Sequence, residues 1–279
     1  MVRIEIGEKM PELPEVETVR RTLLNLIKDA KIIDVSFDYE PMIKMDGFEF
    51  TEKVTGQIIH DIKRYGKYLV FILDEDAMIM HMRMEGKFYV KPYDEPISKY
   101  EHVIFGLDDG RDLRYHDTRK FGTIHLISLA TYESIYPINN LGKEPKDIDG
   151  KDFYKAIHHR NSPIKVSLLD QHLIAGLGNI YVDETLFLSR IHPNRTSSSI
   201  TDKEAKNLIE SATKVLDKAI QLGGTTIRSY TSSLGVHGRF QNELNVHTKE
   251  GEPCPICGQK IIKIKVGGRG TYVCPKCQK

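Results

Sequence analysis

The sequence predicts an α+β protein with a β-sandwich in its N-terminal half, helices in its C-terminal half and a closing β-hairpin. Before about residue 130, apolar segments alternate or run continuously and are rich in β-branched and aromatic residues, as in strands. After about residue 150, apolar residues recur at helical spacing. All four cysteines lie in pairs in the last 26 residues. A length of 279 residues suits two domains, or one domain and a small module.

The expected domain divisions follow these changes in composition. Residues between the two halves mix Pro, Asn, Gly and Asp, which is typical of a linker. The predicted parts are an N-terminal extension at 1–9, a β-sandwich domain with a leading helix at 10–130, a linker at 131–150, a helical domain at 151–250 and a zinc finger at 251–279.

The bulk composition is that of an ordinary soluble protein. Hydrophobic residues make up 40%, charged residues 28%, and the net charge is +1, so any nucleic-acid binding must depend on a local basic patch. No apolar run approaches the ~20 residues of a membrane span. Residues 1–9 lack the apolar stretch of a signal peptide. We therefore expect a cytoplasmic protein with no membrane partner. We also expect it to be a monomer.

The first element is a helix that begins near Pro14. Proline is tolerated in a first helical turn, and the carboxylates of Glu15 and Glu17 suit the positive end of the helix dipole. Apolar residues then recur at spacings of three and four, which predicts one buried face. The residues of that face are Val16, Val19, Leu23 and Ile27.

The residues just before this helix carry a second interpretation, which depends on where the chain begins. If translation starts at Met10 and the methionine is removed, Pro11 has a free secondary amine, and an α-amino group titrates at about 7.7–8.0. Such an amine is partly unprotonated at neutral pH and can attack an electrophilic carbon, with Glu12 beside it as an acid or base. If the chain begins at Met1, Pro11 is an internal imide without a nucleophilic nitrogen.

The remaining elements are predicted from periodicity and turn signals. The expected strand segments are 31–38, 57–73, 78–90, 102–107, 111–116 and 123–128, with an Asp-Asp-Gly hairpin turn at 108–110. The expected helices are 152–159, 164–171, 180–189 and 201–222. The last of these opens with the capping box of Thr201 and Glu204. Residues 225–250 show no period and predict a long loop, which in a compact domain is usually functional or mobile.

The four cysteines form two C-x2-C pairs separated by 16 residues, namely Cys254, Cys257, Cys274 and Cys277. Two such knuckles on a hairpin make a closed tetrahedral zinc site. Because four protein thiolates fill this site, the one expected Zn²⁺ is structural and has no open position for catalysis. Free thiols or disulfides are the alternative, and disulfides do not suit a reducing compartment.

Two features of the C-terminal half predict contact with phosphates. From Cys254 to Lys279 there are six Lys or Arg and no Asp or Glu, and Arg269 follows two glycines at a tight turn. Asn179 follows Gly178 where a helix begins, so free N–H groups and a polar side chain point outward together. The alternatives are a solvated basic hairpin and a plain helix–turn–helix corner.

Three turns of the β-rich half carry candidate functional side chains. Lys67 begins an apolar strand, His81 and Met84 lie at a bend between two strands, and Arg119 and Phe121 follow a hairpin. Apolar side chains can enter a base stack, and an arginine can pair with the base left behind, so Met84, Arg119 and Phe121 can form a wedge. Taken alone, Lys67 is more ordinarily a surface lysine, and Met84 and Phe121 are more ordinarily core residues.

Four motifs together resemble the bacterial formamidopyrimidine-DNA glycosylase family, whose members carry a helix–two-turn–helix motif. They are PELPEVETVRR at 11–21, HDTRKFG at 116–122, GLGNIY at 176–181 and the two cysteine knuckles. The resemblance runs from Met10 to Lys279. It implies an enzyme that removes oxidised purines (8-oxoguanine and formamidopyrimidines) from duplex DNA and cleaves the abasic strand by β,δ-elimination. It also implies a catalytic β-sandwich domain, a helix–two-turn–helix DNA-binding domain with a lesion-capping loop, and a zinc finger.

The resemblance implies a role for each matched residue in the chemistry. Pro11 matches the nucleophile that attacks C1′ of the damaged nucleotide and forms an iminium, and Glu12 matches the acid that protonates the sugar ring oxygen. Glu15 matches a supporting carboxylate. Lys67 and Arg269 match basic residues that assist at the scissile phosphates.

The resemblance also implies a set of DNA-binding residues. Met84, Arg119 and Phe121 match the trio that fills the gap left by the flipped base, and the loop at 225–246 matches a lid over that base. The remaining implied DNA contacts are His81, Lys165 and Asn179.

Two departures from the family pattern keep alternatives open. Family chains commonly have Tyr-Gly where this chain has His247-Thr248, so His247 is a candidate pH-dependent phosphate donor. The extension at 1–9 abolishes the nucleophile if it is retained, and we expect it to be a mis-assigned start. The alternatives are an endonuclease VIII-type glycosylase for oxidised pyrimidines and a non-catalytic DNA-binding zinc protein.

Overall fold

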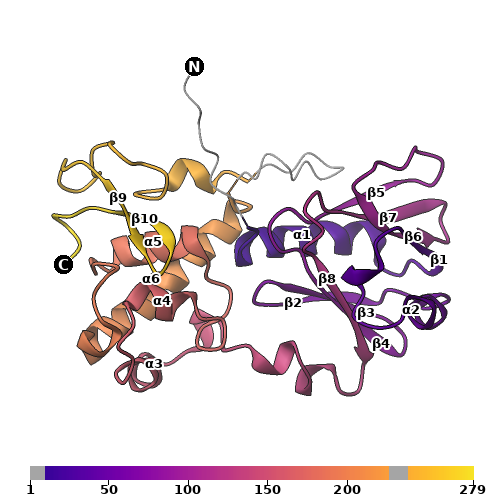
Figure 1. Cartoon of the computed structure of the whole chain (residues 1–279), viewed down its shortest axis with the longest axis horizontal. Helices are drawn as coiled ribbons and strands as arrows, with labels where there is room; N and C mark the ends of the chain where they lie inside the picture. The colour runs from indigo at the N-terminus through magenta and orange to yellow at the C-terminus, as the bar shows by residue number, and fades with distance from the viewer. Residues whose placement is uncertain (1–9, 226–237) are drawn as a thin grey trace. The chain divides into compact units, whose positions relative to one another are not determined.

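The computed structural model describes residues 10–225 and 238–279, which form two compact units (Figure 1). One unit contains the described residues up to Asn139 together with Gly238, and the other contains Asn140–Thr225 and Arg239–Lys279. The division therefore falls inside the segment expected to be a linker. The expected extension at 1–9 and most of the expected lid loop, residues 226–237, lie outside the described residues.

The first unit is a β-sandwich with a leading helix, as the sequence predicted. Its helix α1 spans Leu13–Ile27. One antiparallel sheet has the order β1-β6-β7-β5, with β1 at Ile32–Phe37, β5 at Lys87–Pro92, β6 at Glu101–Leu107 and β7 at Arg111–His116. The other has the order β2-β3-β4-β8, with β2 at Asp61–Tyr65, β3 at Tyr68–Ile72, β4 at Asp76–His81 and β8 at Thr123–Ser128.

Two local features of this unit differ from the sequence prediction. The expected strand segment 57–73 is two strands, because Gly66 adopts a φ of 55° and turns the chain back on itself. Helix α2 at Gly47–Val54 was not expected. It begins where the Asp46 carboxylate accepts hydrogen bonds from the next two free N–H groups, and it buries Phe50. With only eight residues, it is too short to show a helical period in the sequence.

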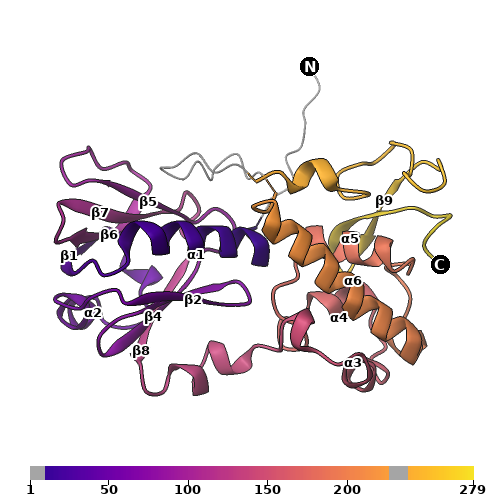
Figure 2. The same cartoon turned by 180° about the vertical axis from the view of Figure 1, so that it is seen from behind.

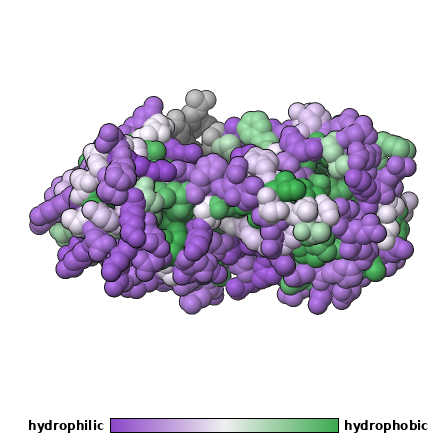
Figure 3. Space-filling model, turned by 90° about the horizontal axis from the view of Figure 1, so that it is seen from below, coloured by the Kyte–Doolittle hydropathy of each residue, from purple (hydrophilic) through white to green (hydrophobic). Residues whose placement is uncertain are grey.

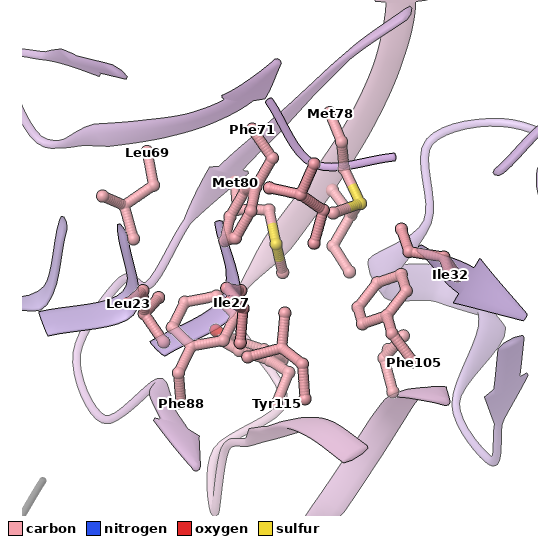
Figure 4. Packing of buried hydrophobic residues seen from close by; sticks show 14 of the residues in the cluster. Leu23, Ile27, Ile32, Leu69, Phe71, Met78, Met80, Phe88, Phe105 and Tyr115 are labelled. Carbon is pink, nitrogen blue, oxygen red and sulfur yellow. The ribbon is translucent and has the colours of Figure 1, made fainter. Parts of the chain in front are cut away.

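A single apolar core joins α1 to both sheets (Figure 4). The four residues predicted to form the buried face of α1 are all buried in it. Rings from both sheets meet beside them, with Phe88 and Phe71 at 5.8 Å and Phe88 and Tyr115 at 5.1 Å between ring centroids. The core therefore fixes the helix that carries Pro11 and Glu12 to the sandwich.

The strand register brings several loops to one end of the sandwich. Tyr68 at the start of β3 pairs with His81 at the end of β4, and His81 pairs with Thr123 at the start of β8. The β2–β3 turn, the loop after β4 and the loop before β8 therefore lie together. In the other sheet, Lys87 at the start of β5 pairs with His116 at the end of β7. The loops 82–86 and 117–122 thus both cross between the sheets at this end.

The second unit is helical and ends in a two-stranded hairpin (Figure 2). Its helices are α3 at Gly150–Ile157, α4 at Ile164–Leu169, α5 at Asn179–Leu188 and α6 at Asp202–Gln221, and each end lies within two residues of the prediction. The hairpin strands are β9 at Ile262–Val266 and β10 at Arg269–Val273.

Short 3-10 turns complete both units, at Glu40–Met42, Tyr132–Ser134, Ile138–Asn140, Pro145–Asp147, Ser197–Ser199 and Phe240–Glu243. Three of them fall in the expected linker, which is therefore more regular than its composition predicted. Within the described residues, no helix is long and apolar enough to cross a membrane. On the face drawn in Figure 3, hydrophilic residues surround small apolar groups.

Candidate active site and nucleic-acid interface

Pro11 and Glu12 lie where the chain enters α1. Glu12 is the N-cap, and its carboxylate accepts a hydrogen bond from the backbone N–H of Glu15. The Glu15 carboxylate in turn accepts one from the Glu12 N–H at 3.0 Å. Only 3% of Glu12 and 4% of Glu15 are exposed, and Pro11 is also buried. This reciprocal cap fixes two carboxylates beside Pro11, and the sequence did not reveal it because glutamate is not a usual N-cap residue.

Glu17 is the anionic centre of a cluster one turn further along α1. Its carboxylate accepts hydrogen bonds from Arg20 at 2.9 Å, Arg21 at 2.7 Å and Arg64 at 3.0 Å. Burial alone would raise the pKa of Glu17, but the three arginines overcome this effect and lower the pKa to about 2. Glu17 is therefore charged at all physiological pH values, and it ties α1 to β2 through Arg64.

The same cluster places the start of α1 near the β2–β3 turn. Arg64 also donates to the Gly66 carbonyl at 3.2 Å, whereas Arg20 donates to the Ile62 carbonyl further back along β2. The N-terminus of α1 therefore points toward the turn that contains Lys67. Lys67 is the second residue of this tight turn and is only 7% exposed. The structure thus brings Lys67 to the same end of the sandwich as Pro11 and Glu12.

His81 lies at the end of β4 and has interactions within the protein. Its Nδ1 accepts a hydrogen bond from the Arg83 N–H at 2.9 Å, and its ring packs edge-on against Tyr68 with centroids 4.6 Å apart. Burial, followed by the positive charges of Arg83 and Lys67, lowers the pKa of His81 to about 3. The imidazole is therefore neutral, and because its Nδ1 accepts from Arg83, its proton is on Nε2, which can still donate a hydrogen bond.

The two crossing loops, 82–86 and 117–122, carry the candidate wedge residues, and we call them the wedge turns. Met84 and Arg119 are half-buried, and Phe121 is 49% exposed. The Arg119 guanidinium carbon lies 4.8 Å from the centroid of the Phe121 ring. The interpretation of Phe121 as a core residue is therefore wrong, and Met84 is only partly enclosed.

Asp117 organises the second wedge turn. It is fully buried, and its carboxylate accepts hydrogen bonds from the backbone N–H groups of Arg119 at 3.0 Å, Phe121 at 2.9 Å and Gly122 at 2.8 Å. A carboxylate that satisfies three backbone donors defines the path of a turn. Asp117 was not among the residues predicted from the sequence, although an aspartate that directly follows a strand is a known turn signal.

Asn179 is the first residue of α5, and the turn before it is held by a glutamine. The Asn179 side-chain N–H donates to the Gly270 carbonyl at 3.0 Å, which places it beside Arg269. Gln171 accepts from the Gly176 N–H at 2.9 Å and donates to the Leu177 carbonyl at 2.8 Å. The two candidate phosphate ligands of this unit, Asn179 and Arg269, are thus neighbours, as their proposed role requires.

Lys165 is fully buried in an ionic network. Its ammonium donates to Asp183 at 2.6 Å and approaches the Gly270 carbonyl at 3.5 Å. The other Asp183 oxygen lies 2.8 Å from His247 Nδ1 and accepts from the Tyr272 N–H at 3.3 Å. Neither Lys165 nor Asp183 has an exposed side chain, so Lys165 acts within the protein, where it holds the hairpin through Asp183 and the Gly270 carbonyl. The His247 Nδ1 is engaged by Asp183, which leaves Nε2 as the nitrogen available for other contacts.

The neighbouring Glu184 anchors the segment that leads to the zinc module. It is 1% exposed, and it accepts hydrogen bonds from the N–H groups of Asn245, Val246 and His247 and from the Asn245 side chain, at 2.9 to 3.0 Å. Asp183 and Glu184 were not among the functional residues predicted from the sequence. The available signal was two adjacent carboxylates in the otherwise apolar helical stretch IYVDETLFL.

Arg269 is exposed at the start of β10, directly after the tight turn of the hairpin. Gly267 and Gly268 have φ values of 55° and 80°, which glycine adopts without strain. A Cβ on Gly267 would lie 2.5 Å from the Val166 side chain. The turn therefore packs closely on α4, and this contact fixes the position of the backbone next to Arg269.

The four cysteines come together as predicted. Their sulfur atoms all lie within 4.8 Å of one another, with Cys257 and Cys274 at 3.5 Å and Cys254 and Cys277 at 3.9 Å. A tetrahedral site with Zn–S bonds of 2.3 Å needs sulfurs separated by about 3.8 Å. The thiols are free of disulfides, so the donor set fits one structural zinc ion. A small core that includes Phe187 of α5 packs against this module.

Comparisons with known proteins cover almost the whole chain. Residues 10–124 match the formamidopyrimidine-DNA glycosylase N-terminal domain. Residues 141–231 match the H2TH domain of the same glycosylases, and residues 251–279 match the zinc finger found in FPG and IleRS.

Individual relatives and solved structures agree with these matches. Formamidopyrimidine-DNA glycosylase from Bacillus cereus is 48% identical over 275 residues, which is 96% of this chain and 99% of that protein. The enzyme of that name from Streptococcus pyogenes is 45% identical over 272 residues, with 97% and 99% covered. A Lactococcus lactis FPG mutant, solved with DNA containing Fapy-dG, is 43% identical with a TM-score of 0.92 over 96% of this chain and 100% of that chain. The sandwich, the helical unit and the four-cysteine hairpin are those of this group, and the chain belongs to the formamidopyrimidine-DNA glycosylase family.

Proposed function

We propose that this DNA glycosylase removes oxidised purines, 8-oxoguanine and formamidopyrimidines, from duplex DNA through the amine of Pro11 and then cleaves the strand. The observation that carries the proposal is the reciprocal cap of Glu12 and Glu15, which fixes buried carboxylates beside Pro11. Lactococcus lactis Fpg has been solved with DNA containing Fapy-dG and with DNA containing an abasic site. These substrates are the two stages that the proposed reaction connects.

The proposed chemistry begins with attack of the Pro11 nitrogen on C1′ of the damaged nucleotide. The base leaves with the electrons of the glycosidic bond and takes up the proton that the Pro11 nitrogen loses, and Glu12 donates a proton to the sugar ring oxygen as the ring opens. The resulting iminium withdraws electrons and acidifies C2′–H. Loss of that proton expels the 3′-phosphate, and a second elimination expels the 5′-phosphate. One nucleophile thereby gives both glycosylase and lyase activity.

The other site residues have proposed roles in holding DNA. Lys67, at the same end of the sandwich, supplies positive charge to a phosphate near the reacting sugar. Arg269 and Asn179 bind phosphates from the second unit. Met84, Arg119 and Phe121 fill the space that the extruded nucleotide leaves in the duplex. Lys165 holds the hairpin in place through Asp183 and the Gly270 carbonyl. We propose that the protein acts on duplex DNA as a monomer.

The proposal requires that Pro11 carry a free amine. When Met10 is joined to Pro11, the nitrogen is a tertiary amide whose lone pair is delocalised into the Met10 carbonyl, so it is not nucleophilic. Intact-mass measurement of the protein made from its native gene identifies the first residue. A protein that begins at Pro11 is expected. A chain that retains residues 1–9 and still excises bases would contradict the proposed nucleophile.

Borohydride trapping tests the reaction itself. Protein beginning at Pro11 is incubated with duplex DNA that contains 8-oxoguanine opposite cytosine, and reduction is expected to give a covalent adduct at Pro11. A parallel duplex with an oxidised pyrimidine tests for an endonuclease VIII-type preference, and faster trapping on that duplex would overturn the proposed substrate. Binding without an adduct on either duplex would leave a non-catalytic DNA-binding protein.

A further inference from the structure

The two wedge turns share one buried support, the phenol of Tyr115 in β7. Tyr115 is 1% exposed. A Cβ built on Gly86, in the first wedge turn, would lie 2.2 Å from the Tyr115 hydroxyl oxygen. A Cβ built on Gly122, in the second wedge turn, would lie 1.9 Å from the same atom. Both turns therefore pack their backbones directly against one hydroxyl group, and any other residue at either position would collide with it.

Packing, and not backbone conformation, accounts for these two glycines. Neither Gly86 nor Gly122 has a positive φ. The left-handed residues of the wedge turns are instead Arg83, with a φ of 54°, and Lys120, with a φ of 57°. Residues other than glycine rarely adopt this region, and they keep it only where the surroundings determine the conformation. Contact with Tyr115 supplies such a determinant to both turns at once.

The Tyr115 hydroxyl also lies close to the Asp117 carboxylate of the second wedge turn. Within the described part of the chain, the hydroxyl has no partner at normal hydrogen-bond distance and geometry. Asp117 is nevertheless near enough that its negative charge, after burial, raises the pKa of Tyr115 well above its usual value, so the phenol keeps its proton. The hydroxyl therefore meets the second wedge turn at Asp117 as well as at Gly122.

A second contact joins the wedge turns nearer the surface. The Thr118 hydroxyl of the second turn donates to the Glu85 carboxylate of the first. The turns are thus linked both at their base, through Tyr115, and at their outer edge. Met84 leaves one turn, and Arg119 and Phe121 leave the other, so this linkage sets the spacing among the three side chains.

We propose that Tyr115 is a positioning residue that couples the two wedge turns, so that Met84, Arg119 and Phe121 enter the duplex as one unit. This inference rests on the proposed function, in which these three side chains fill the space left by the extruded nucleotide. Tyr115 itself touches no DNA in this arrangement. It acts by holding apart and aligning the turns that do.

The first test compares Tyr115→Phe with Tyr89→Phe, which removes a half-buried hydroxyl from β5 of the same sheet. Single-turnover excision of 8-oxoguanine from a duplex needs the wedge, whereas cleavage of an abasic site in single-stranded DNA does not. For Tyr115→Phe, the ratio of the duplex excision rate to the single-stranded cleavage rate is expected to fall about fivefold or more. The reason is that a small misplacement of positioning groups lowers the reaction rate substantially. Tyr89→Phe should keep the wild-type ratio.

The second test measures coupling between the turns. Met84→Ala and Phe121→Ala are made singly and together, in the wild-type and in the Tyr115→Phe protein, and duplex excision is measured. In the wild-type protein, the effects of the two substitutions on the logarithm of the excision rate should be non-additive. In the Tyr115→Phe protein, these effects should be close to additive.

Each possible result bears on the proposal. A wild-type ratio in Tyr115→Phe, or undiminished coupling in that background, would overturn the role of Tyr115. An equal loss on both substrates would also overturn it, because the effect would then lie in the chemistry or the fold. Failure of wild-type protein that begins at Pro11 to cleave the single-stranded abasic site would instead reject the proposed function.

Discussion

The two regions that we propose to contact DNA are held in place by different physical means. In the first unit, the wedge turns rest on uncharged contacts and a buried carboxylate, with Tyr115 packed against two glycines and Asp117 accepting three backbone N–H groups. In the second unit, the hairpin that carries Arg269 depends on a structural zinc site and on the buried pair of Lys165 and Asp183. The proposed nucleophile and its carboxylates therefore belong to one unit, and the zinc site and Arg269 belong to the other.

This difference predicts that chemistry and DNA affinity can be lost separately. The largest effect is expected for Glu12→Gln in protein that begins at Pro11. The amide can still cap α1, but it cannot donate a proton as a carboxylic acid does, so strand cleavage should fall about 10²–10⁴-fold. Gel-shift affinity for an 8-oxoguanine duplex should remain within about twofold of wild type.

Glu52→Gln is the matched control for this substitution, since Glu52 is exposed on α2. It should have the wild-type cleavage rate. A large loss of affinity in Glu12→Gln would show that Glu12 holds the DNA or the fold, and the separation between chemistry and binding would not stand.

The next effect in size concerns the ionic support of the second unit. Asp183→Asn leaves the fully buried Lys165 ammonium without its counterion, and breaking one partner of a buried pair costs about 3–5 kcal/mol. Urea unfolding of the second unit should show this loss. Asp217→Asn, at an exposed position of α6, should unfold like wild type. Equal stability of the two variants would mean that Asp183 is not what holds the hairpin.

The secondary-structure elements of both regions could be predicted from the sequence, whereas the long-range side-chain contacts that hold these elements in place could not. Strand and helix positions follow from local periodicity, and the four cysteines follow from spacing alone, so these could be found without a structure. The contact of Tyr115 with Gly86 and Gly122 could not, because it joins positions 29 and 7 residues apart across two sheets. The environment of Lys165 could not be predicted from the sequence either. The resemblance implied a DNA contact, whereas the structure buries the Lys165 side chain in an ion pair with Asp183.

A smaller effect is expected from the charge cluster on α1. The pKa of Glu17 falls from 4.5 to about 2 on folding, so the carboxylate stabilises the protein above pH 4.5 and loses this contribution as the pH falls toward 2. The shift corresponds to at most about 3 kcal/mol. Glu17→Gln should therefore reduce the drop in unfolding free energy between pH 5 and pH 3.

Glu49→Gln is the comparison for Glu17→Gln, because Glu49 makes an exposed ion pair with Lys53 that contributes little. Its stability should follow the wild-type pH dependence. If Glu17→Gln also follows the wild-type curve, the three arginines do not stabilise the charged carboxylate to the expected extent.

The smallest effect is expected from removal of the zinc site, which tests directly whether the two units act independently. Cys257→Ala removes one of four zinc ligands, so the protein should lose its metal and the hairpin its fixed shape, and affinity for duplex DNA should fall roughly tenfold as phosphate contacts are lost. Ile256→Ala, at an exposed position in the same knuckle, should keep both zinc and affinity. Cleavage of an abasic site in single-stranded DNA by Cys257→Ala, compared at saturating protein, should persist because Pro11, Glu12 and Lys67 belong to the unit that does not contain the four cysteines. Loss of that cleavage together with zinc would show that the two regions depend on each other.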